Sequence, residues 1–281
     1  MRIVLYGAGG PVAAAAIAEL ERDHTLRLTD VRPPDEPHPS LLAEDAARRR
    51  AWWPQRPHPK EHEFRQVDVT RPEQVRAAAE GMDAIVNLTV IRPDPVLSFR
   101  VNMMGAYHVM QAAVAHGIKR VVHTGPEVII NHYRHDFDLS VEAPPRPGTG
   151  YYLLTKYLGQ EVVRSFAETH HLEVVALYFH VFQPADAPEP LPGASPFLVS
   201  WEDTGRAFRA AVEAPPLPNR YEPFIITTDL PHGKFSAEKA QRLLGWHPQD
   251  RFDGHWRRRV PPASAVDHHS PSPPEGEGAR G

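Results

Sequence analysis

The chain has 281 residues, a formal net charge of −4, 31 prolines and no cysteine, which excludes disulfide bonds and thiolate chemistry. The weak negative charge, without a basic run, argues against nucleic acid or an anionic membrane as the main partner. Neither a secretory signal nor an apolar run of the roughly 20 residues that span a bilayer is present, so we expect a cytoplasmic protein. The length suggests one or two domains.

The first element is a short apolar run from Arg2 to Tyr6, typical of a strand buried on both faces of a parallel sheet. A glycine turn follows, and an alanine-rich helix is expected from Ala13 to Leu20. Between a strand and a helix, a glycine turn lets the backbone come close to the pyrophosphate of a dinucleotide, and the helix N-terminus offers N–H groups to the same pyrophosphate. An ordinary loop is the alternative for each glycine taken alone. The expected dinucleotide-binding residues of the turn are Gly7, Gly9, Gly10, Pro11 and Val12.

The second strand, expected from Thr25 to Thr29, ends at the carboxylate of Asp30. A carboxylate at this position accepts hydrogen bonds from both hydroxyls of the adenosine ribose and repels a 2′-phosphate. The sequence therefore favours NAD over NADP. Arg32, two residues further on, is the argument for NADP, since its charge suits a phosphate.

Proline clusters mark the next connection, in which residues 32–60 form an insertion that contains a short expected helix. The third strand is expected from Phe64 to Val69, with Asp68 placed to touch the adenine. Thr70 and Glu73 have the spacing of a capping box, which predicts the start of a helix.

Further strands alternate with helices along the rest of the chain. The strands are expected at residues 84–90, 120–123, 173–178 and 224–227, and a long helix at 101–116. This alternation predicts an α/β fold with a Rossmann-type, doubly wound parallel sheet, in which ligands bind at the carboxyl ends of the strands. We expect a dinucleotide-binding domain at 1–180, a small substrate-binding lobe at 181–260, and a disordered tail at 261–281 that is too polar and proline-rich to form a core.

Tyr152 and Lys156 are four residues apart in a predicted helix, so their side chains share one face. A nearby ammonium ion favours the phenolate and lowers the pKa of a tyrosine, which makes it usable as an acid or base near neutral pH. A surface helix is the alternative interpretation, because the same spacing is common by chance. The pair gains weight from the glycine turn and Asp30 in the same chain.

Together these motifs resemble the extended short-chain dehydrogenase/reductase family, the NAD-dependent epimerase/dehydratase group, from Met1 to about Arg251. The motifs that carry the resemblance are Gly7-x-x-Gly10-x-x-Ala13, Asp30, Asp68-Val69, Asn87-Leu88-Thr89-Val90, Asn102, Tyr152-x-x-x-Lys156 and the closing Leu-Gly245-Trp-His-Pro248. The resemblance implies NAD as the cofactor, with Lys156 holding the nicotinamide ribose and Asn102 bracing the cofactor region. It also implies that Tyr152 moves a proton to or from a substrate hydroxyl while hydride passes to or from the nicotinamide.

Two positions depart from the family pattern. Where relatives carry a serine or threonine that orients the substrate, this chain has Pro126, and Thr124 replaces it only if the loop shifts by two residues. Loss of one such hydrogen bond costs about 10²–10³ in rate, which does not by itself abolish catalysis. Tyr178 stands where many relatives have an arginine, which weakens an assignment to sugar-nucleotide substrates.

Few residues remain for a substrate lobe after the sixth strand. The resemblance therefore implies a small carbohydrate or uronic acid as substrate, because family members that act on sugar nucleotides are generally longer. Two function classes stay open: an NAD-dependent oxidoreductase or epimerase, and a catalytically impaired NAD-binding homologue that acts through a partner. The resemblance implies a homodimer.

His132 and His135 have a spacing that metal ligands use, but no second cluster accompanies them, so we expect no metal.

Overall fold

The computed structural model describes residues 1–34, 36, 62–92, 94–126, 133, 135–188, 195–230 and 233–256. Its centre is a seven-stranded sheet in the order β3-β2-β1-β4-β5-β6-β9, in which all neighbours are parallel. The strand order reverses beside β1, between β1 and β4. The prediction of a doubly wound parallel sheet is confirmed.

The strands are β1 (Arg2–Tyr6), β2 (Thr25–Asp30), β3 (Glu63–Gln66), β4 (Ala84–Asn87), β5 (Arg120–Pro126), β6 (Glu173–Phe179), β7 (Val181–Gln183), β8 (Leu198–Ser200) and β9 (Tyr221–Ile225). The helices are α1 (Pro11–Leu20), α3 (Pro72–Ala79), α4 (Pro95–Ser98), the π-helix η3 (Phe99–Gly105), α5 (Ala106–Ala115), α6 (Tyr151–His170), α7 (Trp201–Val212), α8 (Glu238–Leu244) and α9 (Asp253–Trp256).

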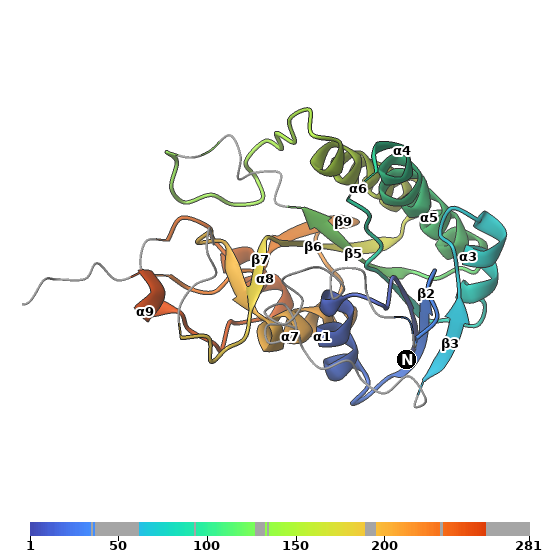
Figure 1. Ribbon diagram of the computed structural model, residues 1–281, viewed down its shortest axis with the longest axis horizontal. Helices are drawn as coiled ribbons and strands as arrows, with labels where there is room; N and C mark the ends of the chain where they lie inside the picture. Colours follow the sequence, from blue (N-terminus) through green and yellow to red (C-terminus); the bar gives the residue numbers. More distant parts are fainter. Residues whose placement is uncertain are drawn as a thin grey trace, which may run out of the picture.

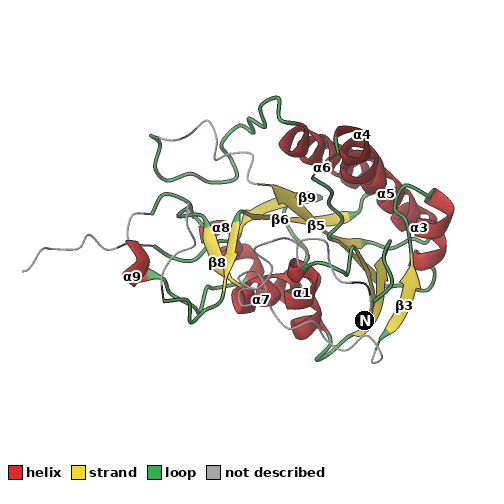
Figure 2. Ribbon diagram, in the orientation of Figure 1, coloured by secondary structure: helices red, strands yellow, loops and turns green. Residues whose placement is uncertain are grey.

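Helices cover both faces of the sheet (Figures 1 and 2). On one face, α1, α7 and α8 pack on alternate strand residues such as Ile3 and Leu5. On the other face, α3, α5 and α6 pack on the intervening residues, including Val4 and Tyr6. Since both faces of a central strand such as β1 are buried, its sequence is apolar without alternation, as a parallel sheet requires.

The small pair β7–β8 and helix α9 lie at one end of the sheet (Figure 1). Two later elements join the main layers: β9 pairs with β6, and α7 packs against α1. The expected lobe at 181–260 is therefore interleaved with the main sheet. Most of the 32–60 insertion and all of the 261–281 tail lie outside the described residues. None of the helices in the described part combines the length and apolar character needed to cross a bilayer.

Two local expectations are wrong. The helix expected from 101 begins earlier, because α4 and the π-helix η3 lead into α5. The capping box at Thr70 and Glu73 does not form: Arg71 is the N-cap of α3 and makes no side-chain cap, while the backbone N–H of Thr70 donates to Asp68. Pro72 does occupy the first turn of α3, where its missing N–H costs nothing.

Candidate active site

The glycine turn lies between β1 and α1, at the carboxyl end of the sheet. Gly7 has a φ of +84°, and a Cβ atom there would lie 3.0 Å from the backbone of Leu88 and Thr89, so a side chain is excluded. The backbone N–H of Gly9 donates to Oδ2 of Asp30 at 2.8 Å. This bond holds the carboxylate at the end of β2 against the turn.

A cavity of about 210 Å³ opens beside this turn. The predicted residues in its lining are Gly7, Gly10, Asp30, Asp68, Val69, Leu88, Thr89 and Val90. All of them lie at or just after the carboxyl ends of β1 to β4, where α/β sheets bind ligands. The lining suits a dinucleotide: the glycines of the turn carry no side chain that would obstruct a pyrophosphate, and Asp30 offers a carboxylate to ribose hydroxyls. Of the other turn residues, Pro11 is the first residue of α1 and Val12 packs on the core.

Arg32 lies beside the same carboxylate. Its backbone N–H donates to Oδ1 of Asp30 at 3.1 Å, and its guanidinium is 3.7 Å from that oxygen. The ion pair places the guanidinium beside Oδ1 of Asp30, whereas Oδ2 accepts the hydrogen bond from Gly9. Residues present at the end of β2 therefore fit NAD, the cofactor that the sequence favours.

Asn102 connects the cavity to helix α6. Its Oδ1 accepts from the backbone N–H of Ile91 at 2.9 Å, and its Nδ2 donates to the carbonyl of Ile91 at 3.0 Å and to Oγ1 of Thr155 at 3.0 Å. Ile91 lines the cavity, and the hydroxyl of Thr155 donates to the carbonyl of Tyr152. One buried side chain thus holds the cavity wall and the first turn of α6 together.

Tyr152 and Lys156 lie on α6, as predicted, one turn apart. The Lys156 side chain is buried against the sheet, whereas Tyr152 is half-buried. A guanidinium nitrogen of Arg92 lies 3.2 Å from the phenol oxygen of Tyr152, and the guanidinium carbon is 4.7 Å from the ring centroid. The phenol therefore has a cation in contact with it in addition to the lysine one turn away.

Beneath these residues, Asn87 and His123 form a buried polar pair. Oδ1 of Asn87 accepts from the N–H and the hydroxyl of Thr89, so its Nδ2 is the donor to Nδ1 of His123 at 3.2 Å. A neutral imidazole that accepts at Nδ1 carries its proton on Nε2. Burial and, second, the charge of Lys156 hold the pKa of His123 well below its ordinary value. His123 is neutral and lies close to Lys156.

Thr124 and Tyr178 are placed as parts of the sheet. The strand β5 continues through Thr124 to Pro126, and the hydroxyl of Thr124 donates to the carbonyl of Asn87 at 3.1 Å. Its role toward the substrate stays a prediction. Tyr178 is buried and shares a hydrogen bond of 3.1 Å with the hydroxyl of Tyr221, and burial raises its pKa to about 12.

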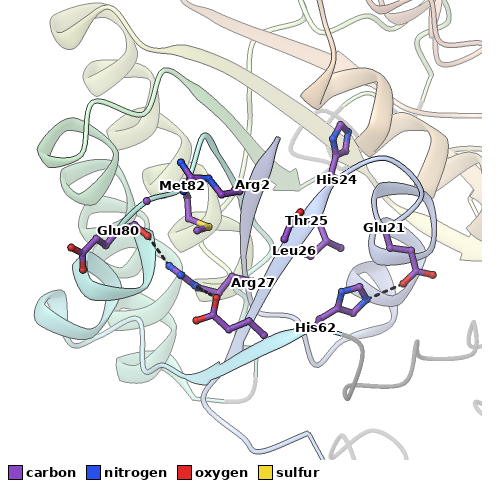
Figure 3. Close-up of a pocket in the computed structure, with 11 residues that line it drawn as sticks. Arg2, Glu21, His24, Thr25, Leu26, Arg27, His62, Glu80 and Met82 are labelled. Carbon is purple, nitrogen blue, oxygen red and sulfur yellow. Dashed lines mark hydrogen bonds and ion pairs between the residues drawn. The ribbon is translucent and has the colours of Figure 1, made fainter.

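A larger cavity, of about 560 Å³, lies at the opposite end of the strands, near the amino ends of β1 and β2 (Figure 3). Its polar side chains are engaged with one another: His62 contacts Glu21 at 2.9 Å, and Arg27 bonds the carbonyl of Glu80 and the carboxylate of Glu63. Because ligands of such sheets bind at the carboxyl ends of the strands, we assign the function to the smaller cavity.

Sequence reasoning missed Arg92 as a member of the site. Arg92 follows the β4 motif by two residues but is 60 positions from Tyr152 in the chain, and no local pattern links them. That no metal binds stays a prediction; among the described residues, no group of three or more His, Asp or Glu side chains could hold a metal ion. His132 lies outside them, and His135 is exposed.

Comparison with known proteins adds independent findings. Residues 3–193, well over half of the chain, match the family described as NAD dependent epimerase/dehydratase. A uronate dehydrogenase of Pseudomonas putida is 24% identical over 269 residues, which cover 80% of this chain and 92% of that protein. An L-arabinose 1-dehydrogenase (NAD(P)(+)) of Haloferax volcanii is 26% identical over 212 residues, with 66% of this chain and 81% of that protein covered.

Among solved structures, a uronate dehydrogenase from Agrobacterium tumefaciens in complex with NAD aligns with a TM-score of 0.69 and 23% identity. The alignment covers 89% of this chain and 84% of that chain. At this identity the likeness supports the fold alone.

Proposed function

Because this chain belongs to the NAD-dependent epimerase/dehydratase family, we propose that it oxidises a hydroxyl of a small carbohydrate or uronic acid. Family membership makes it an NAD-dependent enzyme of the dehydrogenase and epimerase type. In the proposal Tyr152 is the acid/base and Lys156 holds the nicotinamide ribose. Gly7, Gly9 and Asp30 hold the adenosine and pyrophosphate half.

One observation carries the proposal: the segment after β4 touches both halves of the site. Leu88 to Ile91 line the cofactor cavity, and Arg92, the next residue, contacts the phenol oxygen of Tyr152 at 3.2 Å. Asn102 holds Ile91 and Thr155 in this relation through three hydrogen bonds. A tyrosine that contacts the residue next to the cavity wall can exchange a proton with a hydroxyl bound beside the dinucleotide.

The residues of the site divide the reaction between them. Bound NAD⁺ supplies the acceptor for the hydride that leaves the substrate carbon. Tyr152 takes the proton from the hydroxyl on that carbon, so that a C=O bond forms as the C–H bond breaks. The positive charges of Lys156 and Arg92 favour the phenolate form of Tyr152 that accepts the proton. Thr124 is proposed as the second polar contact to the substrate, since Pro126 has no hydrogen-bond donor.

Uronic acids are the proposed substrate class. The uronate dehydrogenases that match this chain are named for such substrates, and the arabinose relative is named for oxidation at carbon 1. We therefore propose the anomeric hydroxyl as the reacting group, with a lactone as product. The positive charge of Arg92 next to Tyr152 suits a substrate that carries a carboxylate.

The experiment is a comparison of Tyr152→Phe with Tyr151→Phe on D-galacturonate and D-glucuronate, followed by NADH absorbance. Tyr151 is the matched control, because it is the preceding residue and is more exposed. We expect turnover to fall at least about 10³-fold in Tyr152→Phe and to change little in the control. NAD⁺ affinity should stay within a factor of two in both. Retained turnover in Tyr152→Phe contradicts the mechanism.

We also propose a cytoplasmic homodimer. Val96, Phe99 and Met104, from α4 and η3, are large apolar side chains that are 63%, 37% and 39% exposed. Exposed apolar residues on neighbouring helices support a subunit contact. Sedimentation equilibrium tests the proposal: Val96→Asp with Phe99→Asp should convert a dimer of about twice 31.5 kDa into a monomer.

A further inference from the structure

We propose that Arg92 is a specificity-determining residue that binds the substrate carboxylate and the phenol oxygen of Tyr152 at the same time. This inference rests on the proposed function and adds to it the group that selects an acidic sugar. It starts from one contact, in which the Arg92 guanidinium stacks on the Tyr152 ring at 4.7 Å and directs a nitrogen at the oxygen, 3.2 Å away.

The position of Arg92 is set by its backbone. The preceding residue, Ile91, is bound through both its N–H and its carbonyl by Asn102, and Ser98 also donates to that carbonyl at 3.3 Å. Asn102 lies in the π-helix η3, a distortion that recurs at functional sites. These hydrogen bonds, the clamp on Ile91, fix the backbone next to Arg92 beside α6. Only the Arg92 side chain is then left to adjust to a ligand.

Arg92 has hydrogen-bonding capacity left over. A guanidinium has five N–H donors, and within the described residues the one at Tyr152 is its only hydrogen bond. The residue is exposed, so an entering ligand reaches it. Arginine binds carboxylates with two parallel hydrogen bonds, which its planar donor geometry allows. The remaining donors are therefore suited to a carboxylate, whereas a neutral hydroxyl uses only one.

Geometry decides where that carboxylate lies. A hydroxyl that gives its proton to Tyr152 must come within about 2.6–3.2 Å of the phenol oxygen, next to the guanidinium. In a pyranose uronic acid, the carbon that bears the carboxylate is separated from the anomeric carbon only by the ring oxygen. Both groups then reach one guanidinium at once. A second arginine is not needed for this. Tyr178, which stands where many relatives have an arginine, is hydrogen-bonded to Tyr221.

The test compares Arg92→Gln with Arg100→Gln, which removes the same charge from a neighbouring exposed position. Each variant is assayed on D-galacturonate and on D-galactose, which differ only at carbon 6. An effect through Tyr152 acts on both sugars and cancels in the ratio of their kcat/KM values. We expect Arg92→Gln to lower the ratio of galacturonate to galactose by about 10–100-fold, the worth of a charge-assisted hydrogen bond. An unchanged ratio overturns the carboxylate role.

A substrate-free readout tests the second half of the proposal. In ultraviolet difference titrations with NAD⁺ bound, the Tyr152 ionisation, identified by its loss in Tyr152→Phe, should move to higher pH in Arg92→Gln but not in Arg100→Gln. Arg92→Lys keeps the charge and should move it less. No shift in Arg92→Gln overturns the contact with Tyr152. If the native enzyme oxidises neither sugar while the shift is present, the proposed substrate class fails and the Arg92–Tyr152 contact stands.

Discussion

Nδ2 of Asn102 lies 3.0 Å from Oγ1 of Thr155, and this buried hydrogen bond joins the π-helix η3 to the first turn of α6. The carbonyl of Asn102 also runs so close to α6 that a Cβ atom on Gly159 would lie 2.3 Å from its oxygen. The π-helix η3 and helix α6, which carries Tyr152, are therefore in contact through backbone as well as side chain. Small changes at this contact should alter both stability and activity.

Replacement of Asn102 by alanine should lower the free energy of unfolding by about 1–3 kcal/mol, because the N–H and carbonyl of Ile91 lose their partner. Turnover should fall as well, since Ile91 and Arg92 are no longer held beside Tyr152. Urea denaturation and NADH formation measure the two effects. Thr155→Val removes one of the three bonds, and also the bond from its hydroxyl to the carbonyl of Tyr152, but leaves Ile91 bound to Asn102. It is the control, for which we expect a smaller loss of stability. Equal losses in both variants contradict the clamp.

Replacement of Gly159 by alanine should destabilise the protein by about 1–3 kcal/mol, the usual cost of overpacking. The substituted Cβ would collide with the backbone oxygen of Asn102, and this cost exceeds the helix propensity gain of at most about 1 kcal/mol. Gly150→Ala is the control at the N-cap of the same helix, where no heavy atom lies within 4 Å of the added carbon. We expect it to cost less than about 1 kcal/mol in the same urea titration.

Replacement of Asp30 by alanine should weaken NAD⁺ binding by about 10–100-fold and NADP⁺ binding much less. The carboxylate is proposed to accept hydrogen bonds from the ribose hydroxyls and to repel a 2′-phosphate, and Arg32 remains in place to pair with that phosphate. Isothermal titration calorimetry with each dinucleotide measures the change. Asp68→Ala is the control for this preference, because a carboxylate that touches the adenine should affect the affinity for both dinucleotides equally. Equal losses of affinity for the two dinucleotides refute the ribose role.

The stability of the protein should fall with acidification below about pH 6.5, in part because of His123. Burial, and then the charge of Lys156, hold the pKa of His123 well below its ordinary value in the folded state. Below the ordinary histidine pKa, which applies in the unfolded chain, the imidazole of His123 binds a proton only in the unfolded state. The free energy of unfolding therefore rises with pH by up to about 1.4 kcal/mol per pH unit, and it levels off above about pH 7.

His123→Gln should flatten this dependence between pH 5 and pH 7, as measured by urea denaturation at several pH values. His247→Gln is the control, because that histidine is exposed. If both variants keep the slope of the native protein, the neutral buried state of His123 is wrong.

The amino-acid sequence by itself determined the elements and their chemistry. Continuous apolar runs identified β1 and β4 because both faces of a central parallel strand are buried. The turn at Gly7, the carboxylate at Asp30 and the Tyr152–Lys156 spacing were also readable, since each depends only on neighbours in the chain or on one helical turn. These local signals suffice for the fold class and for the cofactor.

Only the tertiary structure decided which distant residues meet. The contact of Arg92 with Tyr152 and the burial of His123 beside Lys156 join elements that local periodicity does not relate. The sequence of η3 predicts an ordinary α-helix, whereas the structure has a π-helix there, and its Asn102 carbonyl lies close to Gly159 of α6. Such features depend on packing between elements, whose free energy is spread over many side chains and leaves no short pattern in the chain.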